Sequence, residues 1–160
     1  MKKWMFLLSI LLIVNLAACS SNKENAQSAS ASKETASEVT KNTDTSSLQL
    51  LQNEKVGEYL ADSKGLTLYY FKNDKSGLST CKDECLKTWP PFNATDFKVP
   101  QGFNKEDFNT ITRADTGQAQ VTYKGYPLYY FVNDKSKGDV NGQGVKNVWY
   151  IVNVKTTFNQ

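Results

Sequence analysis

The hydrophobic and polar positions divide the chain into three zones. Trp4 to Leu16 form a predominantly apolar stretch of 13 residues, and Ser20 to Ser47 are mostly small or polar residues with Val39 as their only large aliphatic residue. From residue 48 onward, short runs rich in strand-forming residues alternate with Gly, Pro, Asn and Asp. Runs of this kind are typical of strands joined by turns. The pattern predicts a mainly β domain over residues 48–160, preceded by two segments that do not belong to it.

The strongest pattern within this domain is an internal repeat. The segment Lys64–Ser76 recurs sixty residues later as Lys124–Ser136, with ten of thirteen positions identical. A fixed offset of this kind indicates one structural unit used twice. In each copy a Lys-Gly turn precedes a Leu-Tyr-Tyr-Phe run and an Asn-Asp-Lys-Ser turn, so we predict a strand in each.

Side-chain alternation gives each of these strands two different faces. In the first copy Leu68 and Tyr70 are predicted on one face, and Tyr69 and Phe71 on the other.

Further strands and one helix surround the two copies. We predict two hairpins whose first arms and turns are Gly57–Asp62 with Ser63–Gly65, and Gln118–Tyr123 with Lys124–Gly125. The remaining predicted elements are strands at Phe108–Arg113 and Asn147–Val154, and a helix at Lys82–Thr88 capped by Ser79 or Thr80 and stopped by Pro90. The expected fold is mainly β: two related hairpin or meander repeats, about 57–92 and 117–154, in one compact domain with a short helical turn between them.

The N-terminal zones carry an export signal. Lys2 and Lys3 precede the apolar stretch, which is too short to cross roughly 30 Å of hydrocarbon as an ordinary helix. The stretch ends in Leu16-Ala17-Ala18-Cys19, which resembles the bacterial lipobox. That resemblance implies that residues 1–18 are cleaved and that Cys19 carries a diacylglycerol at the cell membrane. The alternative is an ordinary secretory signal with a chance cysteine.

Residues 20–47 then form a polar tether, which cannot bury enough apolar surface to fold. With Cys19 they make up the segment 19–47, and as a flexible coil the tether would reach about 30 Å.

The repeated residues also resemble a known family. Tyr69–Asp74 and Tyr129–Asp134 both match a Tyr-x-aromatic-x-x-Asp motif, and Cys81-x-x-x-Cys85-x-x-x-Trp89 resembles the segment that follows the first copy. Chains with this combination are predicted bacterial lipoproteins, also described as a secreted repeat of unknown function. The resemblance covers about residues 57–152 and implies an exported, usually lipid-anchored domain without an established reaction.

Cys81 and Cys85 are the two thiols that remain if Cys19 is lipidated. In a helix, residues four apart share a face and lie within the usual disulfide range, and the compartment is oxidising. A structural disulfide is the first interpretation. A reversible dithiol is the second, and a metal site completed by Asp83 and Glu84 is the third.

Composition excludes several kinds of chemistry. The chain has no histidine, and both methionines, Met1 and Met5, lie in the predicted signal peptide. The mature protein therefore lacks the residues for Ser-His-Asp or Cys-His catalysis and for His-ligated zinc, copper or haem. Residues 48–160 hold 14 basic and 12 acidic residues without a basic stripe, and Arg113 is the only arginine. We expect no enzyme activity, no cofactor beyond the lipid and no nucleic-acid partner.

Aromatic residues are the candidate binding groups. Seventeen of the 113 residues from 48 to 160 are aromatic, including all eight tyrosines. They fit either a stacking surface for a planar or sugar ligand or the core of a small β domain. The aspartates of the motif fit either ligand binding or a turn residue that hydrogen-bonds its own backbone. The candidate ligand contacts are Tyr69, Phe71, Asp74, Tyr129, Phe131 and Asp134.

A weak metal candidate lies further along the chain. Asp139 and Asn141 occupy positions 1 and 3 of a calcium-loop-like segment, but Tyr150 stands where the bidentate Glu is expected. A Gly-rich surface turn is the better interpretation, and no metal site is expected.

Three functions compete for this sequence. The first is a non-catalytic binding or structural module of the cell envelope, anchored in the bilayer, with an unknown envelope ligand or protein as its partner. The second is a thiol–disulfide redox or electron-transfer factor that uses Cys81 and Cys85. The third is a hydrolase with carboxylates alone, drawn from Asp74, Asp134, Asp139 and Asp115, whose side chains the sequence does not bring together.

Overall fold

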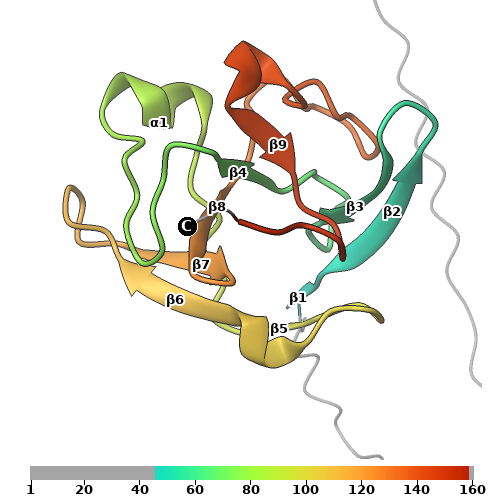
Figure 1. The fold of residues 1–160 in the computed structure, drawn as a ribbon, viewed down its shortest axis with the longest axis horizontal. Coiled ribbons are helices and arrows are strands. Elements are labelled where there is room, and N and C mark those ends of the chain that lie inside the picture. Colours follow the sequence, from blue (N-terminus) through green and yellow to red (C-terminus); the bar gives the residue numbers. More distant parts are fainter. Residues whose placement is uncertain (1–45, 159–160) are drawn as a thin grey trace, which may run out of the picture. The chain divides into compact units, whose positions relative to one another are not determined.

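The computed structural model describes residues 46–158 (Figure 1), so the predicted signal peptide, lipidated cysteine and most of the tether lie outside the described residues. The strands are β1 (Ser46–Ser47), β2 (Gln49–Asn53), β3 (Gly57–Ala61), β4 (Tyr69–Phe71), β5 (Phe97–Lys98), β6 (Phe108–Thr112), β7 (Ala119–Tyr123), β8 (Tyr126–Tyr129) and β9 (Trp149–Ile151). The helical elements are α1 (Glu84–Thr88) and the 3-10 turns η1 (Lys105–Asp107) and η2 (Val145–Asn147). The mainly β fold is confirmed.

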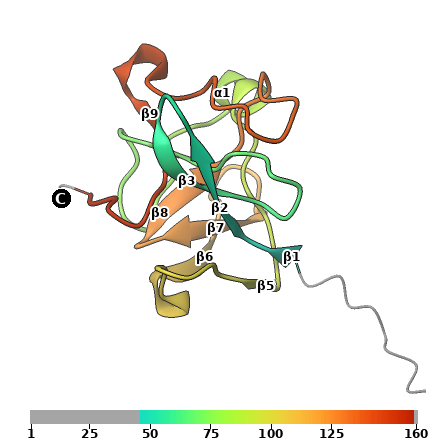
Figure 2. The same ribbon diagram turned by 90° about the vertical axis from the view of Figure 1, so that its right-hand side faces the viewer.

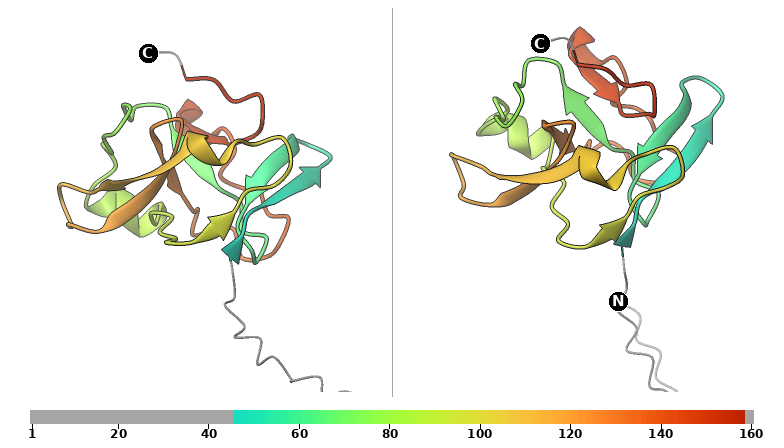
Figure 3. Two further views of the ribbon diagram at one scale, coloured as in Figure 1. Left: turned by 90° about the horizontal axis from the view of Figure 1, so that it is seen from below. Right: turned by 60° about the horizontal axis from the view of Figure 1, so that its bottom comes forward.

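The main sheet has five antiparallel strands in the order β6-β7-β8-β4-β9. Its central pair joins the two copies of the repeat, because Tyr69 in β4 lies directly opposite Tyr129 in β8. These residues are sixty positions apart, so the two copies face each other across an approximate two-fold axis. Figure 2 shows the β2–β3 hairpin beside this sheet, and Figure 3 shows β5 next to β1, with which it pairs in parallel.

Each copy is completed by the segment that follows the other copy. The N–H groups of Lys72 and Val132 donate to the carbonyls of Val148 and Thr88, at 2.7 and 3.0 Å. The next pair of equivalent bonds follows the same rule, from Val152 to Leu68 at 3.2 Å and from Phe92 to Leu128 at 2.9 Å. In both pairs of bonds the donors and the acceptors differ by sixty positions. The residues around Trp89 therefore lie along β8, and β9 lies along β4.

The predicted two faces of the first motif strand are confirmed. Leu68 and Tyr70 belong to one apolar cluster, with Phe92, Phe108 and Leu128 among its buried members. Tyr69 and Phe71 belong to a second cluster on the other face of the strand. The sheet thus separates two cores, and the alternation of the motif assigns each side chain to one of them.

The second predicted hairpin is confirmed, and the first forms with a short pairing and an additional partner strand. β7 and β8 pair around Lys124 and Gly125, whose φ angles of 48° and 85° are those of a type I′ turn. In the first copy β3 pairs along its whole length with β2, and it meets the predicted second arm in a bridge between Ala61 and Thr67 and a bond from the Leu68 N–H to the Leu60 carbonyl at 2.9 Å. Asp62 Oδ1 accepts the N–H groups of Lys64 and Leu66 in the intervening turn, each at 2.9 Å.

Two other boundaries differ from the prediction, and the predicted strand from Phe108 is confirmed as β6. β9 spans Trp149–Ile151 rather than the longer run from Asn147 to Val154. The helix ends at Thr88 as predicted, but its N-cap is Asp83, which makes no side-chain cap bond. Within residues 46–158 we find no helix with the length and hydropathy needed to cross a membrane.

Candidate functional site

The two copies of the motif exchange hydrogen bonds between their tyrosines and aspartates. The Tyr69 hydroxyl donates to Asp134 Oδ2 at 2.6 Å, and the Tyr129 hydroxyl donates to Asp74 Oδ2 at 2.7 Å. Tyr69 and Tyr129 are fully buried, and the aspartates are 5% and 7% exposed. We call these the reciprocal bonds. They explain the spacing of the motif, because each copy supplies one donor and one acceptor to the other.

Each aspartate also closes the turn at the end of its own strand. Asp74 Oδ1 accepts the N–H of Thr80 at 2.6 Å and its hydroxyl at 2.9 Å. Asp134 Oδ1 accepts the N–H of Asn141 at 2.9 Å. One carboxylate oxygen therefore serves the local turn, as the sequence predicts for Asp after Asn, while the other crosses to the partner copy. Thr80 holds this turn and does not cap the predicted helix.

The environment of the reciprocal bonds disfavours charge. Burial raises the pKa of both carboxyl groups, Asp74 and Asp134, above the usual range of aspartate. Burial also raises the pKa of the phenols of Tyr69 and Tyr129, and the neighbouring carboxylates raise it further. The phenols therefore keep their protons and act as donors, while the carboxylates act as acceptors.

A second polar contact orients each phenol. The Gly142 N–H donates to the Tyr69 hydroxyl oxygen at 3.2 Å. A Cβ atom at this glycine would lie 2.7 Å from Tyr69 Cζ and 2.9 Å from Trp89 Cη2, so a larger residue would displace the ring. In the other copy Ser79 Oγ shares a 2.6 Å hydrogen bond with the Tyr129 hydroxyl, so Ser79 does not cap the helix either.

Arg113 strengthens one side of this arrangement. It is 2% exposed, and its guanidinium donates to Ser79 Oγ at 3.0 Å and to the Cys81 carbonyl at 2.6 Å. The same guanidinium pairs with Asp115 at 2.8 Å and holds the pKa of that carboxyl below its usual range. A buried, hydrogen-bonded network therefore runs from Arg113 through Ser79 to Tyr129.

Four aromatic rings form a continuous stack beside the reciprocal bonds. Trp89 and Trp149 lie face to face, with centroids 3.8 Å apart and planes 3° from parallel. Phe71 stacks on the outer face of Trp149, and Phe131 on the outer face of Trp89, each at 4.3 Å. Both pairs are related by the sixty-residue offset. Tyr69 and Tyr129 contact the tryptophans edge to face, at 5.5 and 5.1 Å.

The stack lines a groove of about 690 Å³ between α1 and η2, which lie at the same end of β4 (Figure 1). We call this the aromatic groove. Its apolar floor is the four-ring stack, and its polar rim includes Asn73 and Asn133, one from each copy. Within residues 46–158 the side-chain amides of both asparagines make no hydrogen bond and are exposed. Glu84 and Lys146 complete the rim.

The structure divides the six predicted ligand contacts into two groups. Phe71 and Phe131 line the aromatic groove. The other four are buried in the reciprocal bonds, where their polar atoms bind one another, so they are placed in the core rather than on a binding surface. These four are Tyr69, Asp74, Tyr129 and Asp134.

The two tryptophans at the centre of the stack are not among the ligand contacts predicted from the sequence, although Trp89 belongs to the family-like motif. Their signal is the repeat itself, because Trp89 and Trp149 differ by the same sixty positions as the motif. The Pro-Pro that follows Trp89 and the Tyr-Ile that follows Trp149 conceal the relationship.

Cys81 and Cys85 form a disulfide with Cα atoms 5.3 Å apart, as their spacing predicts. Cys81 is buried, whereas Cys85 is partly exposed and lines the aromatic groove. The predicted metal ligands are engaged in a turn: Asp139 Oδ2 accepts the N–H groups of Lys135 and Ser136, each at 2.8 Å. Asn141 donates its side-chain amide to a backbone carbonyl. In the described part of the chain, no three His, Cys, Asp or Glu side chains cluster as metal ligands.

A comparison with protein families gives two matched segments, residues 51–93 and 109–153. They contain the two copies of the repeat and cover more than half of the chain. The chain belongs to the family described as a secreted repeat of unknown function. Searches of curated proteins and of solved structures gave no match. In this secreted repeat the paired motif residues form the core, and the side chains next to them form the groove.

The reciprocal bonds predict different costs for two buried tyrosines of the secreted repeat. Tyr69→Phe leaves a buried carboxylate oxygen without its donor, so we expect a loss of about 2–3 kcal/mol in the free energy of unfolding. Tyr59→Phe is the matched control, because the Tyr59 hydroxyl is buried without a hydrogen-bond partner among the described residues. We expect that change to be neutral within about 0.5 kcal/mol or stabilising. Denaturant unfolding measures both, and equal costs would contradict the assignment.

The raised pKa values of Asp74 and Asp134 predict a pH dependence. The folded state binds protons to these carboxyls more tightly than the unfolded state, so their contribution to the free energy of unfolding rises as pH falls from neutral towards 4. An Asp74→Asn/Asp134→Asn variant lacks this gain, so the stability difference in favour of the unmodified protein should grow on acidification. Asp115→Asn should show the opposite trend below about pH 4, since the pKa of Asp115 is lowered and its contribution is lost only below the ordinary aspartate range. Unfolding curves from neutral pH to about pH 3 test both signs.

Proposed function

We propose that this secreted repeat is a lipid-anchored, non-catalytic module whose aromatic groove binds an extracytoplasmic ligand. The observation that carries the proposal is the groove itself: an apolar floor of four stacked rings bordered by exposed polar groups from both copies. Apolar walls with a few placed polar groups are the usual composition of a ligand site. A planar ligand with polar edge groups would fit the floor and the two unpaired amides.

The sequence supports the anchored location. The lipobox-like segment that ends at Cys19 would attach two or three acyl chains, and chains in that number hold a protein stably on a bilayer. The tether that follows would let the domain move about 30 Å from the surface. A binding module held in this way samples ligands near the membrane without entering it.

The aromatic groove has few titratable side chains that could serve acid–base catalysis. Glu84 is the one carboxylate among its described lining residues. It is exposed and pairs with Lys87 at 2.6 Å. The buried carboxylates Asp74 and Asp134 are already bound in the reciprocal bonds and do not line the groove. This arrangement favours binding over the carboxylate hydrolase that the sequence left open.

Tryptophan fluorescence reports on ligand binding in the aromatic groove, because Trp89 and Trp149 lie in its floor. They are the two tryptophans that remain after the signal peptide is removed. Thr88→Arg would place a long side chain into the groove from the end of α1, and Thr95→Arg is the matched control at an exposed site away from it. With the dye anilinonaphthalene sulfonate as the probe, we expect Thr88→Arg to weaken binding by about tenfold and Thr95→Arg to leave it unchanged. Equal binding by both variants would contradict the proposal.

One observation favours a second candidate, a thiol–disulfide factor. Cys85 is the more exposed half of the disulfide and lines the aromatic groove, so a partner thiolate bound there would reach its sulfur. Attack at Cys85 would release Cys81 as the leaving thiolate and form a mixed disulfide with the partner. Reduction by a second thiolate would complete the exchange.

The reduction potential distinguishes the two functions. A structural disulfide is expected to resist reduction below about −300 mV, whereas a redox factor would titrate above about −230 mV. Differential alkylation of the full chain across a series of thiol buffers, read by mass spectrometry, gives this value. We expect the lower range for a binding module, and a potential in the upper range would favour the redox function.

A further inference from the structure

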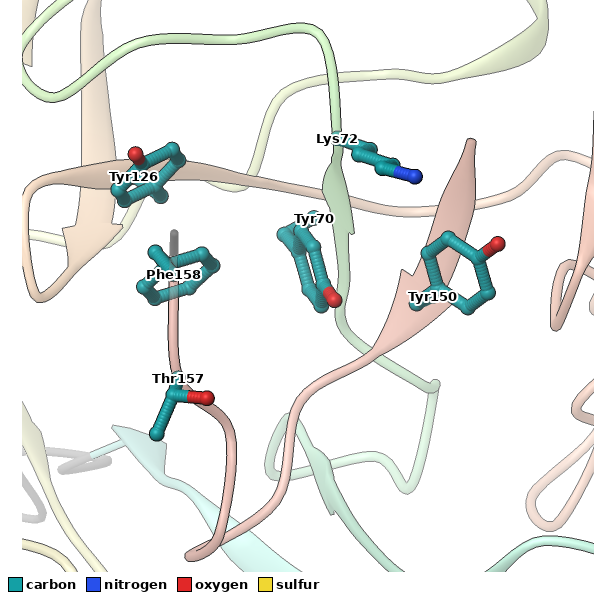
Figure 4. A pocket seen from close by; sticks show the side chains of 6 residues that line it. All are labelled: Tyr70, Lys72, Tyr126, Tyr150, Thr157 and Phe158. Carbon is teal, nitrogen blue, oxygen red and sulfur yellow. The ribbon is translucent and has the colours of Figure 1, made fainter. Parts of the chain in front are cut away.

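A second hollow lies on the other face of the central strands, and it breaks the symmetry of the repeat. It has a volume of about 290 Å³ and lies between β4, β8, β9 and the C-terminal segment (Figure 4). We call it the tyrosine pocket. Its lining residues are Tyr70, Lys72, Tyr126, Tyr150, Thr157 and Phe158. By strand alternation, Tyr70 and Lys72 point away from the aromatic groove, so the two sites are separate.

The equivalent position in the other copy is closed. Tyr130 lies sixty residues after Tyr70, and its hydroxyl donates to Asp62 Oδ2 at 3.0 Å. Its ring packs edge to face on Phe92 at 5.6 Å. The Tyr70 hydroxyl makes no hydrogen bond to any other residue in the range 46–158, and Tyr70 lines the tyrosine pocket instead. The Tyr130 hydroxyl is thus bound by a residue of the other copy, whereas the Tyr70 hydroxyl is left available to a ligand.

The difference between the Tyr70 and Tyr130 hydroxyls arises from one residue that differs between the copies. The N–H groups of Leu60 and Val121 donate to the carbonyls of Val152 and Phe92, which occupy equivalent positions in the two copies. Leu60 and Val121 are therefore structural equivalents. Counting two residues onward, Asp62 corresponds to Tyr123, which carries no carboxylate. The second copy therefore has the aromatic ring of Tyr123 at the position where an acceptor for the Tyr70 hydroxyl would lie.

The charge around the tyrosine pocket is positive. Lys72 is exposed and makes no ion pair within the described residues, and none of the residues that line the pocket is acidic. An adjoining hollow of about 280 Å³ shares Tyr126, Thr157 and Phe158 with it and adds Lys124. The Lys124 ammonium donates to the Thr156 carbonyl at 3.3 Å, so Lys72 is the lysine of the pocket that is open to an anion. An anion bound there would meet no opposing carboxylate in the lining.

The aromatic lining of the pocket suits a single ring. Tyr126 and Phe158 stack at 3.9 Å, Tyr70 packs edge to face on Phe158 at 4.9 Å, and Tyr70 and Tyr150 lie 5.9 Å apart. The four rings therefore form one continuous aromatic surface (Figure 4). A dry cavity of about 150 Å³ accommodates benzene, so this volume holds one six-membered ring with a substituent. Tyrosine rings offer an apolar face to the C–H groups of a sugar, and their hydroxyls bind its oxygens.

We propose that the tyrosine pocket binds one acidic sugar residue of an extracytoplasmic glycan. The sugar ring lies against the aromatic surface formed by these rings, Lys72 binds its carboxylate, and the Tyr70 hydroxyl binds a ring hydroxyl. The location of a secreted family brings the site to such glycans. The site does not depend on the aromatic groove or on the disulfide.

The test uses the full chain with tyrosines labelled with ¹³C, titrated with glucuronate, glucose and benzoate. We expect glucuronate to shift the ring signals of Tyr70, Tyr126 and Tyr150, and to bind at least about tenfold more tightly than glucose or benzoate. Benzoate separates a free aromatic acid from an acidic sugar. Preferential binding of benzoate, or unmoved signals for these three rings, would overturn the proposal.

Matched variants separate binding from folding. Lys72→Gln should weaken glucuronate binding by about tenfold, whereas Lys98→Gln, an exposed change outside the pocket, should leave it unchanged. Tyr70→Phe should weaken binding without lowering the unfolding midpoint. Tyr130→Phe should lower the midpoint and leave the affinity unchanged, since it loses the bond to Asp62. Equal affinities for Lys72→Gln and Lys98→Gln would overturn the proposal.

Discussion

The fold depends on two buried hydrogen bonds that run between the copies of the repeat, from Tyr69 to Asp134 and from Tyr129 to Asp74. A buried carboxylate without a donor is costly, so neither copy can bury its aspartate unless the other supplies a tyrosine. The backbone hydrogen bonds that β4 and β8 form with the segment following the other copy also require both copies to be present. The motif therefore specifies a pair of units that fold together, and the polar residues that recur in both copies serve assembly rather than a surface.

This constraint also determines where binding surfaces can form. The approximate two-fold axis brings Trp89 and Trp149 face to face and places equivalent side chains on both sides of one groove. On the opposite face, the same axis relates Tyr70 to Tyr130, but a different residue at the position of Asp62 leaves one of the two phenols unpaired. Duplication thus supplies one symmetric site at the axis and one asymmetric site away from it.

Sequence patterns predicted the elements whose residues lie close together along the chain. The motif strands, their two faces, the second hairpin, the end of α1 and the disulfide all follow from residues within a few positions of one another. The turn role of Asp74 was also among the sequence-based alternatives, but its burial was not predicted, because the donor Tyr129 lies 55 residues away. The exchange of segments between copies depends in the same way on partners far along the chain, which propensity does not reveal. The strand β2 was not predicted either, although its partner β3 is its neighbour in the chain.

The central claim is that each tyrosine is coupled to the aspartate of the other copy, and two double-mutant cycles on the free energy of unfolding test it directly. Tyr69→Phe with Asp134→Asn should show an interaction of at least about 1 kcal/mol, whereas Tyr69→Phe with Asp74→Asn should be additive within about 0.5 kcal/mol. Additivity in the first cycle, or stronger coupling within one copy, would contradict the account.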